Sequence, residues 1–192
     1  MMGISALLSV LYLIISRLAY VVGVGFALTQ QDRNQFFTRR YGVDGGWRRF
    51  KSIASPIMLN DGIAFVTLNV MTINTLSVDV PRLALIIFGF IIGITGIVVK
   101  VWATATLGPK AYYWHNFFAP QRVTPKASGP YKYFKNPMYG IGYLQTYGLA
   151  LVLGSLPGLV AAAFMQAGIF AFNHFVEKPH FETLRGPVGA NS

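Results

Sequence analysis

The chain has 192 residues, of which 54% are hydrophobic and 11% are charged. Because charged residues make up about 25% of an ordinary soluble domain, this composition excludes that class and predicts an integral membrane protein. The formal net charge is +10, and since the positive residues lie between apolar segments, we expect anionic lipid head groups and no nucleic acid as their partners.

Five apolar segments follow one another along the chain, and about 20 apolar residues suffice for a helix to cross a bilayer core. The first is too long and too apolar for a signal peptide. The last two are short and are separated by Gly154-Ser-Leu-Pro-Gly158, a turn-forming sequence. We therefore predict an all-α, polytopic membrane helical bundle with about five transmembrane helices, the last two forming a tight helical hairpin. It is a single membrane domain (residues 1–192) with spans at about 3–28, 57–76, 83–107, 139–153 and 159–176.

Lysine and arginine predict the orientation of these spans, because positive residues are retained on the cytoplasmic side during insertion. Most of them fall in segments 33–51, 110–135 and 178–185, whereas the opposite side carries Arg82 alone. We expect the N-terminus outside and the C-terminus inside, in a bacterial inner membrane or an endoplasmic reticulum membrane. Residues 108–138 and 177–192 then lie in the cytoplasm.

Two basic residues remain within the spans. Lys100 is close enough to a helix end for its ammonium group to reach the head-group region, whereas Arg17 is close to mid-span and must face protein or water. Arg17 is either a functional residue or half of a structural pair. The second span also carries polar residues, which either line a cavity or bond neighbouring helices: Asn60, Asp61, Thr67, Asn69 and Asn74.

Small residues mark one face of the third span. Gly89 and Gly93 are four residues apart, and Gly96 follows them. Another helix can approach such a face closely. We predict that this face packs against a neighbouring helix.

Common catalytic motifs are absent from the sequence. There is no Gly-Lys-Ser/Thr phosphate loop, no Gly-x-Ser-x-Gly elbow and no His-Glu-x-x-His helix, and the absence of cysteine excludes thiolate chemistry. His174 and His180 are six residues apart, which is not one helical face, and His115 is distant from both. We expect no metal site.

Glutamate occurs only at Glu177 and Glu182, just after the last span. A hairpin of two antiparallel helices of similar length brings its two ends together, so the segment Asn136-Pro-Met-Tyr139 is predicted to lie beside Glu177. A carboxylate, an amide and aromatic rings then share one membrane interface. They form either a binding site or an ordinary interfacial belt of Tyr, Lys and Glu.

These residues resemble the small integral membrane methyltransferases, the superfamily of isoprenylcysteine carboxyl methyltransferase and the phospholipid N-methyltransferases. The resemblance covers residues 107–184 and lies in Gly129-Pro-Tyr-Lys-Tyr-Phe-Lys-Asn-Pro-Met-Tyr139 and in Glu177-x-Pro179 followed by Phe181. Asn-Pro-Met-Tyr is most similar to the phosphatidylethanolamine N-methyltransferase branch. Lys178 departs from that branch, which usually has a second Glu at this place.

The resemblance implies an enzyme that uses S-adenosylmethionine to methylate a membrane lipid, with the head-group amine of a phosphatidylethanolamine-type phospholipid as the preferred acceptor. Glu177 would bind the ammonium group of the methyl donor through a charge-assisted hydrogen bond, and the tyrosines would stack on adenine or contact the sulfonium. The cytoplasmic segments 108–138 and 177–192 are then the catalytic segments. The cofactor-binding residues are Gly129, Tyr131, Tyr133, Asn136, Pro137, Tyr139 and Glu177.

The acceptor side of such a reaction needs two further kinds of residue. An amine must be neutral to attack, and the candidates for accepting its proton are His115, His174 and Glu182. A lipid phosphate would be attracted by nearby cations, and the candidates are Lys126, Lys132 and Lys135. These lysines have the alternative role of setting the membrane topology alone.

Three other functions remain open from the sequence. One is carboxyl methylation of a prenylated cysteine by the same superfamily. Another is an NADPH-dependent membrane reductase of related architecture, since such reductases share a similar Gly-Pro-Tyr-x-Tyr arrangement. The third is a non-catalytic membrane subunit or carrier, in which Arg17 and the polar residues of the second span would line a path.

Overall fold

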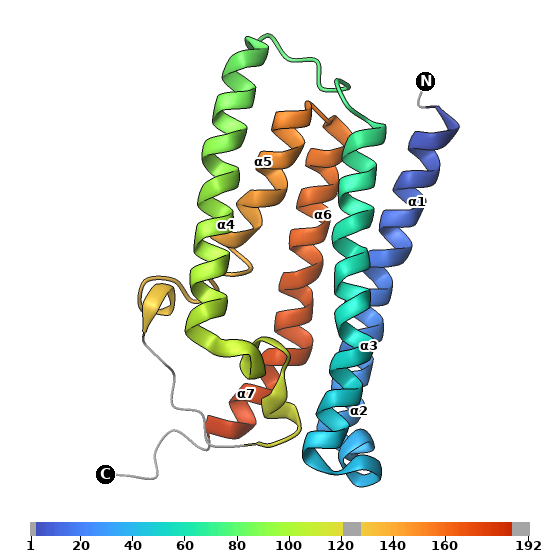
Figure 1. Ribbon diagram of the computed structural model, residues 1–192, viewed down its shortest axis with the longest axis vertical. Helices are drawn as coiled ribbons and strands as arrows, with labels where there is room; N and C mark the ends of the chain where they lie inside the picture. The colour runs from blue at the N-terminus through green and yellow to red at the C-terminus, as the bar shows by residue number, and fades with distance from the viewer. Residues whose placement is uncertain (1–2, 121–127, 186–192) are drawn as a thin grey trace.

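Helices make up almost all of the computed structural model, which describes residues 3–120 and 128–185. Four helical rods are long and apolar enough to cross a membrane, and a shorter apolar helix, Ile141–Leu153, lies among them. Figure 1 shows the long helices running along one common axis. The all-α membrane bundle of about five helices predicted from the apolar segments is confirmed.

The first rod, Ile4–Asn34, consists of α1 (Ile4–Leu18), a π-helical segment η1 (Ala19–Val24) and α2 (Gly25–Asn34). It is followed by α3 (Phe36–Met71) and, after a connecting loop, by α4 (Arg82–Tyr112). Three short 3₁₀ helices come next in the described residues, η2 (His115–Phe117), η3 (Gly129–Lys132) and η4 (Ile141–Tyr143). The helical hairpin consists of α5 (Leu144–Leu153) and α6 (Leu156–Phe172). It is followed by a second π-helical segment, η5 (Asn173–Glu177), and by the helix α7 (Lys178–Arg185).

The largest difference from the sequence-based spans is the length of α3. Its apolar span was predicted to begin at residue 57, but the helix begins at Phe36 and passes through the basic segment with a break at Gly42, where φ is +70°. The start is stabilised by Gln31, whose side-chain oxygen accepts hydrogen bonds from the backbone N–H groups of Phe37 (3.0 Å) and Thr38 (3.2 Å). Such N–H groups have no partner within the helix. Hydropathy marks only the lipid-facing part of a helix and therefore missed this polar extension.

The glycine face of the third span packs against α5. A methyl group added to Gly96 would lie 2.3 Å from the backbone nitrogen of Gln145, and one added to Gly89 would lie 2.9 Å from the carbonyl oxygen of Gly148. Gly148 is equally constrained from the other side, since its added carbon would lie 2.5 Å from Gly93 Cα. The two helices can approach this closely only because neither presents a side chain at the contact.

The hairpin between α5 and α6 turns at Gly154, which has φ +62°, a conformation that favours glycine. Ser155 then caps α6 by accepting a hydrogen bond from the backbone N–H of Gly158 at 2.8 Å. Arg82, at the start of α4, donates hydrogen bonds to the carbonyl groups of Leu151 (2.9 Å) and Val152 (2.5 Å) at the end of α5. The arginine thus supplies donors to carbonyl groups at the end of α5, where the Leu151 carbonyl also accepts the backbone N–H of Gly154 at 3.0 Å.

Arg17 joins four separate elements in the middle of the bundle. Its Nη1 donates to Asp61 Oδ2 on α3 at 2.8 Å, and its Nη2 donates to the Tyr143 hydroxyl of η4 at 3.0 Å and to the backbone carbonyl of Met165 on α6. Arg17 is 1% exposed and Asp61 is 4% exposed. Of the two roles left open by the sequence, the structure gives Arg17 that of a partner in a buried ion pair.

We expect Gly148→Ala to lower the thermal stability of the protein in detergent. The added methyl group would meet backbone atoms of α4 at 2.5 Å, so one helix must shift, at a cost of about 1 to 3 kcal/mol. Gly23→Ala is the matched control, because nothing lies within 4 Å of the methyl group it adds. Equal melting temperatures for the two variants would contradict this account of the α4–α5 contact.

Removal of one partner of the ion pair should destabilise the bundle more than removal of both. Arg17→Leu leaves the Asp61 carboxylate buried without its cation, which costs about 3 to 5 kcal/mol, whereas replacing a whole buried pair by apolar residues is often close to neutral. Unfolding of Arg17→Leu and of the double variant Arg17→Leu/Asp61→Leu, followed by circular dichroism in the same micelles, checks this. A double variant no more stable than the single one would show that the pair is not the relevant interaction.

Candidate active site

A buried carboxylate, Glu177, is the centre of the polar site at the α7 end of the bundle. It is 6% exposed and accepts three hydrogen bonds from side chains of three different segments. Trp114 Nε1 and the Tyr139 hydroxyl donate to Oε1 at 2.5 Å and 2.7 Å, and Asn173 Nδ2 donates to Oε2 at 2.6 Å. Charged hydrogen bonds of this kind are the strong ones, so Glu177 is held in one position.

The π-helical segment η5 places Glu177 beside its partners. η5 continues α6 directly and carries both Asn173 and Glu177. π-Helical turns inside helices are rare and occur frequently at functional sites. Gly25 allows the first rod to pack closely here, because a methyl group at this residue would lie 3.2 Å from Val176 Cγ2.

Trp114 reaches Glu177 from the segment that follows α4. Its backbone has φ +51°, which is uncommon for a residue with a side chain and is found often at functional sites. The indole is 4% exposed and packs against the rings of Phe172 (centroids 5.4 Å apart) and Phe50 (6.2 Å). Packing therefore fixes the indole N–H toward the carboxylate.

The Asn136–Tyr139 segment lies beside Glu177, as the hairpin predicted. Tyr139 donates a hydrogen bond to the carboxylate directly. Asn136 is linked to it through Asn173, because Asn136 Nδ2 donates to Asn173 Oδ1 at 3.2 Å and Asn173 donates to Glu177. Gln166 on α6 holds the segment from the other side by donating to the carbonyl groups of Tyr139 (3.0 Å) and Gly140 (3.2 Å). Pro137 is fully buried within this turn.

The other predicted cofactor-binding residues, Tyr131, Tyr133 and Gly129, differ in their burial and in their neighbours. Tyr131 is half-buried, and burial together with the nearby Glu177 carboxylate raises the pKa of its hydroxyl to about 12. Tyr133 is 67% exposed and is not among the side chains that donate a hydrogen bond to Glu177. Gly129, with φ +56°, lies against α4, since an added methyl group would meet Thr106 Oγ1 at 2.4 Å. Packing against Thr106 is thus enough to require glycine here.

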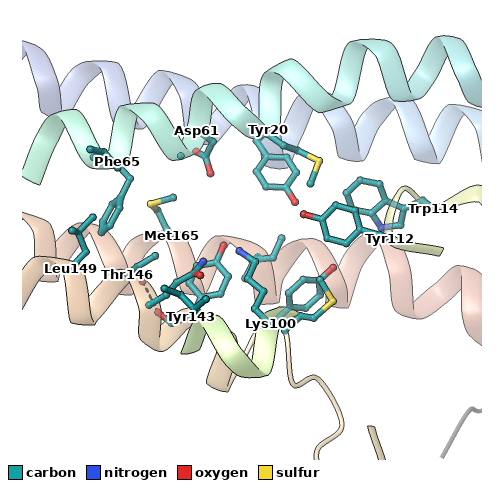
Figure 2. A pocket seen from close by; sticks show the side chains of 18 residues that line it. Tyr20, Asp61, Phe65, Lys100, Tyr112, Trp114, Tyr143, Thr146, Leu149 and Met165 are labelled. Atoms are coloured by element: carbon teal, nitrogen blue, oxygen red, sulfur yellow. Dashed lines mark hydrogen bonds between the residues drawn. The ribbon is translucent and has the colours of Figure 1, made fainter. Parts of the chain in front are cut away.

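A cavity of about 430 Å³ lies between the helices next to this site. Figure 2 shows its labelled walls, with Trp114 at one end, Leu149 at the other, and Asp61 facing Lys100 across the middle. Most of the wall is apolar or aromatic, and the aromatic residues include Tyr20, Tyr112, Trp114, Tyr139 and Tyr143. Since Trp114 and Tyr139 also bind Glu177, the cavity and the carboxylate share one wall.

The three predicted proton acceptors all lie off the wall of this cavity. His174 is exposed on η5 beside Phe175, with ring centroids 4.8 Å apart. Glu182 is exposed on α7, where its carboxylate lies 3.8 Å from Lys178 Nζ. His115 is half-buried, and its ring contacts Trp47 with centroids 4.9 Å apart.

Two of the three predicted phosphate-binding lysines lie in the described residues, and both lie off the cavity wall. Lys132 and Lys135 are exposed around η3 and the loop after it, and neither lines the cavity. Lys126 lies outside the residues that the structure describes. Lys178 stands where the phosphatidylethanolamine N-methyltransferase branch usually has a second glutamate, and it is exposed on α7.

Two partners of Glu177, Trp114 and Asn173, were missed by the sequence-based prediction. Each is an ordinary residue for a membrane interface and carries no motif of its own. The run Tyr112-Tyr-Trp-His115 was the available signal for Trp114, since four consecutive aromatic or imidazole side chains just after a span are unusual. Asn173 is four residues before Glu177 in a helical segment, which places the two side chains on one face.

The fold and the site together define an integral membrane protein of the helical class with a buried, multiply hydrogen-bonded carboxylate beside an intramembrane cavity. The phospholipid methyltransferase family model matches residues 84–186, which include α5 to α7, α4 from its third residue on, and every side-chain hydrogen-bond partner of Glu177 found in the described residues. The chain therefore belongs to the phospholipid methyltransferase family.

Similar proteins are named phosphatidylethanolamine N-methyltransferase. The one from Podospora anserina is 28% identical over 188 residues, which cover 93% of this chain and 20% of the relative. Those from Clavispora lusitaniae and Schizosaccharomyces pombe are each 31% identical and each cover 73% of this chain, but 18% and 16% of the respective relative. The chain thus spans about a fifth of the length of these curated relatives. No solved structure matches it.

We expect Trp114→Phe to destabilise the protein, because the phenyl ring keeps the aromatic packing but removes the N–H donor to Glu177. A buried charged group that loses a partner costs about 1 to 3 kcal/mol. The measurement is thermal unfolding in detergent, with Trp102→Phe as the control because Trp102 is 47% exposed on α4. If the two variants unfold at the same temperature, the indole hydrogen bond contributes nothing to stability.

Proposed function

We propose that this chain is an S-adenosylmethionine-dependent methyltransferase whose acceptor is the head-group amine of a phosphatidylethanolamine-type phospholipid. The observation that supports it best is the buried Glu177 carboxylate, held beside an aromatic cavity inside a bundle of the phospholipid methyltransferase family. The names of these relatives favour an amine acceptor over a prenylated cysteine or a reductase substrate.

The hydrogen bonds of Glu177 leave room for the ammonium group of the methyl donor. An ionised carboxylate accepts about four hydrogen bonds, two on each oxygen. Trp114 and Tyr139 occupy Oε1, whereas Oε2 receives only Asn173. One acceptor position of Oε2 therefore remains for an ammonium N–H, and Asn136 and Tyr131 lie in the same neighbourhood for further contacts.

The chain's contribution to methyl transfer is to hold the reactants in line and to exclude water. When bound, S-adenosylmethionine supplies an electrophilic methyl group carried by a sulfonium. The aromatic rings of Trp114 and Tyr139 line the cavity and favour a cation beside them. An amine acceptor must first lose a proton, and because His115, His174 and Glu182 lie off the cavity wall, transfer to any of them needs an intervening group.

The same proposal includes the orientation of the chain. Figure 1 shows α7 and the start of α3 at the same end of the bundle. The basic segment 178–185 is α7, and the basic segment 33–51 runs from the end of α2 into α3. Positive residues are retained in the cytoplasm. We therefore infer that the Glu177 end faces the cytoplasm and that the N-terminus lies outside.

Glu177→Gln should weaken binding of S-adenosylmethionine by roughly 30-fold or more, because loss of one partner of a buried charged hydrogen bond costs about 2 to 5 kcal/mol. The measurement is a calorimetric titration of the purified protein in detergent. Asp79→Asn is the control, since Asp79 is an exposed carboxylate in the loop between α3 and α4.

Two results would contradict the proposal. One is a folded Glu177→Gln variant with the same dissociation constant as the wild type. The other is a wild-type protein that binds NADPH and fails to bind S-adenosylmethionine. Transfer of labelled methyl groups to a base-stable amine rather than to a base-labile ester distinguishes lipid N-methylation from carboxyl methylation.

A further inference from the structure

Two charged side chains of the cavity remain unexplained by the site around Glu177. Asp61 projects from α3 and Lys100 from α4, and Figure 2 shows them facing one another across the cavity. We propose, on the basis of the proposed function, that they bind the head group of the acceptor phospholipid. Lys100 takes the phosphate, and Asp61 Oδ1 accepts a hydrogen bond from the amino group.

Lys100 lacks an anionic partner of its own. It is half-buried, and within residues 3–120 and 128–185 no carboxylate lies within 4.0 Å of its Nζ. Its ammonium group lies 5.9 Å from the centroid of the Tyr143 ring. A partly desolvated ammonium in this setting is a binding site for an anion.

Only one of the two carboxylate oxygens of Asp61 accepts a hydrogen bond from the described residues. Oδ2 accepts the hydrogen bond from Arg17, whereas Oδ1 is buried and has no hydrogen-bond partner among the residues that the structure describes. A buried acceptor without a partner costs about 1 to 3 kcal/mol and is uncommon in native proteins. Because the side chain lines the cavity, a donor located there can satisfy it.

The charges select the kind of ligand. Arg17 and Asp61 neutralise one another, so Lys100 leaves the cavity wall with one unmatched positive charge. A free anion would match Lys100 but leave Asp61 Oδ1 without a donor, and a simple amine would do the reverse. A phosphate linked to an amine satisfies both, because the phosphate charge matches Lys100 and an amine N–H donates to Asp61 Oδ1, and this is the chemistry of an ethanolamine phospholipid head group.

An apolar groove next to the cavity provides a place for an acyl chain of the same lipid. The groove has a volume of about 550 Å³, runs along α3 from Leu59 to Met71, and shares Gly62 and Val66 with the cavity wall. Nothing lies within 4 Å of a methyl group added to Gly62, so no side chain fills the wall shared by the two spaces at this residue. A lipid can therefore keep its head group in the cavity while its chain follows α3.

Lys100→Gln tests the phosphate contact in mixed micelles of detergent and phosphatidylethanolamine. We expect the KM for the lipid to rise roughly 30-fold or more, with an unchanged dissociation constant for S-adenosylmethionine. Lys110→Gln is the control, since Lys110 is exposed on the same helix and does not line the cavity. Asp61→Asn should raise the lipid KM in the same way, and if this variant does not fold, Lys100→Gln and the groove variant below decide the matter.

Gly62→Phe tests the connection to the groove. A Cβ at this residue meets nothing within 4 Å, and a phenyl ring attached to it would occupy the wall shared by the cavity and the groove, so we expect a large rise in the lipid KM. Gly23→Phe is the control, because a Cβ added there also meets nothing within 4 Å and Gly23 lies off the cavity wall. Soluble phosphoethanolamine is tested as a competitor of the lipid. Its inhibition constant should rise in Lys100→Gln and stay unchanged in Gly62→Phe.

The outcomes separate this inference from the proposed function. If the wild type methylates phosphatidylethanolamine and both Lys100→Gln and Gly62→Phe retain its KM, the head-group site is wrong while the methyltransferase assignment stands. If the wild type neither binds S-adenosylmethionine nor methylates the lipid, both fail. Raised lipid KM with unchanged cofactor binding supports both.

Discussion

The ion pair between Arg17 and Asp61 is the constraint on which the rest of the bundle depends. A charge in the middle of a membrane span is costly unless it faces protein and finds a partner, and here one guanidinium bonds groups on α3, η4 and α6 at once. These bonds fix how α1 is rotated against its neighbours. The same rotation turns Tyr20 toward the cavity, one helical turn along from Arg17. The pair therefore shapes the space in which a lipid head group would be held.

The Glu177 site extends the same principle to the end of the bundle. Its carboxylate is buried but is bonded by an indole, a phenol and an amide, so the polar groups satisfy one another before any ligand arrives. Each donor comes from a different part of the chain, and each is fixed by packing or by a further hydrogen bond, as Gln166 fixes the backbone at Tyr139. A site assembled in this way is preorganised, which reduces the reorganisation needed when a charged ligand binds.

The fold was largely predictable because a bilayer imposes simple rules on composition, and the sequence obeys them. The apolar segments predicted the bundle, Gly89 and Gly96 predicted a close helix contact, and the turn at Gly154 predicted that Tyr139 and Glu177 would meet. The polar start of α3 was missed because hydropathy does not detect helix outside the lipid. The aromatic run at residues 112–115 marks Trp114 but not its partner, because the direction of the indole depends on the turn after α4. The place of Lys100 across the cavity from Asp61 depends on how the helices are rotated. That rotation is set by packing, which no local pattern in the sequence records.

The π-helical segments have a consequence for how this chain can vary. A π-turn accommodates one residue more than the α-helix it interrupts, and each residue added to or removed from a helix rotates everything beyond it by about 100°. In η5, loss of a single residue would turn the Glu177 carboxylate away from Trp114 and Tyr139 without changing any side chain. The loop between α3 and α4 carries no hydrogen-bond partner of Glu177 and is free of this constraint. Homologous chains should therefore differ freely in the length of that loop while keeping the residue count between Gly154 and Glu177 fixed.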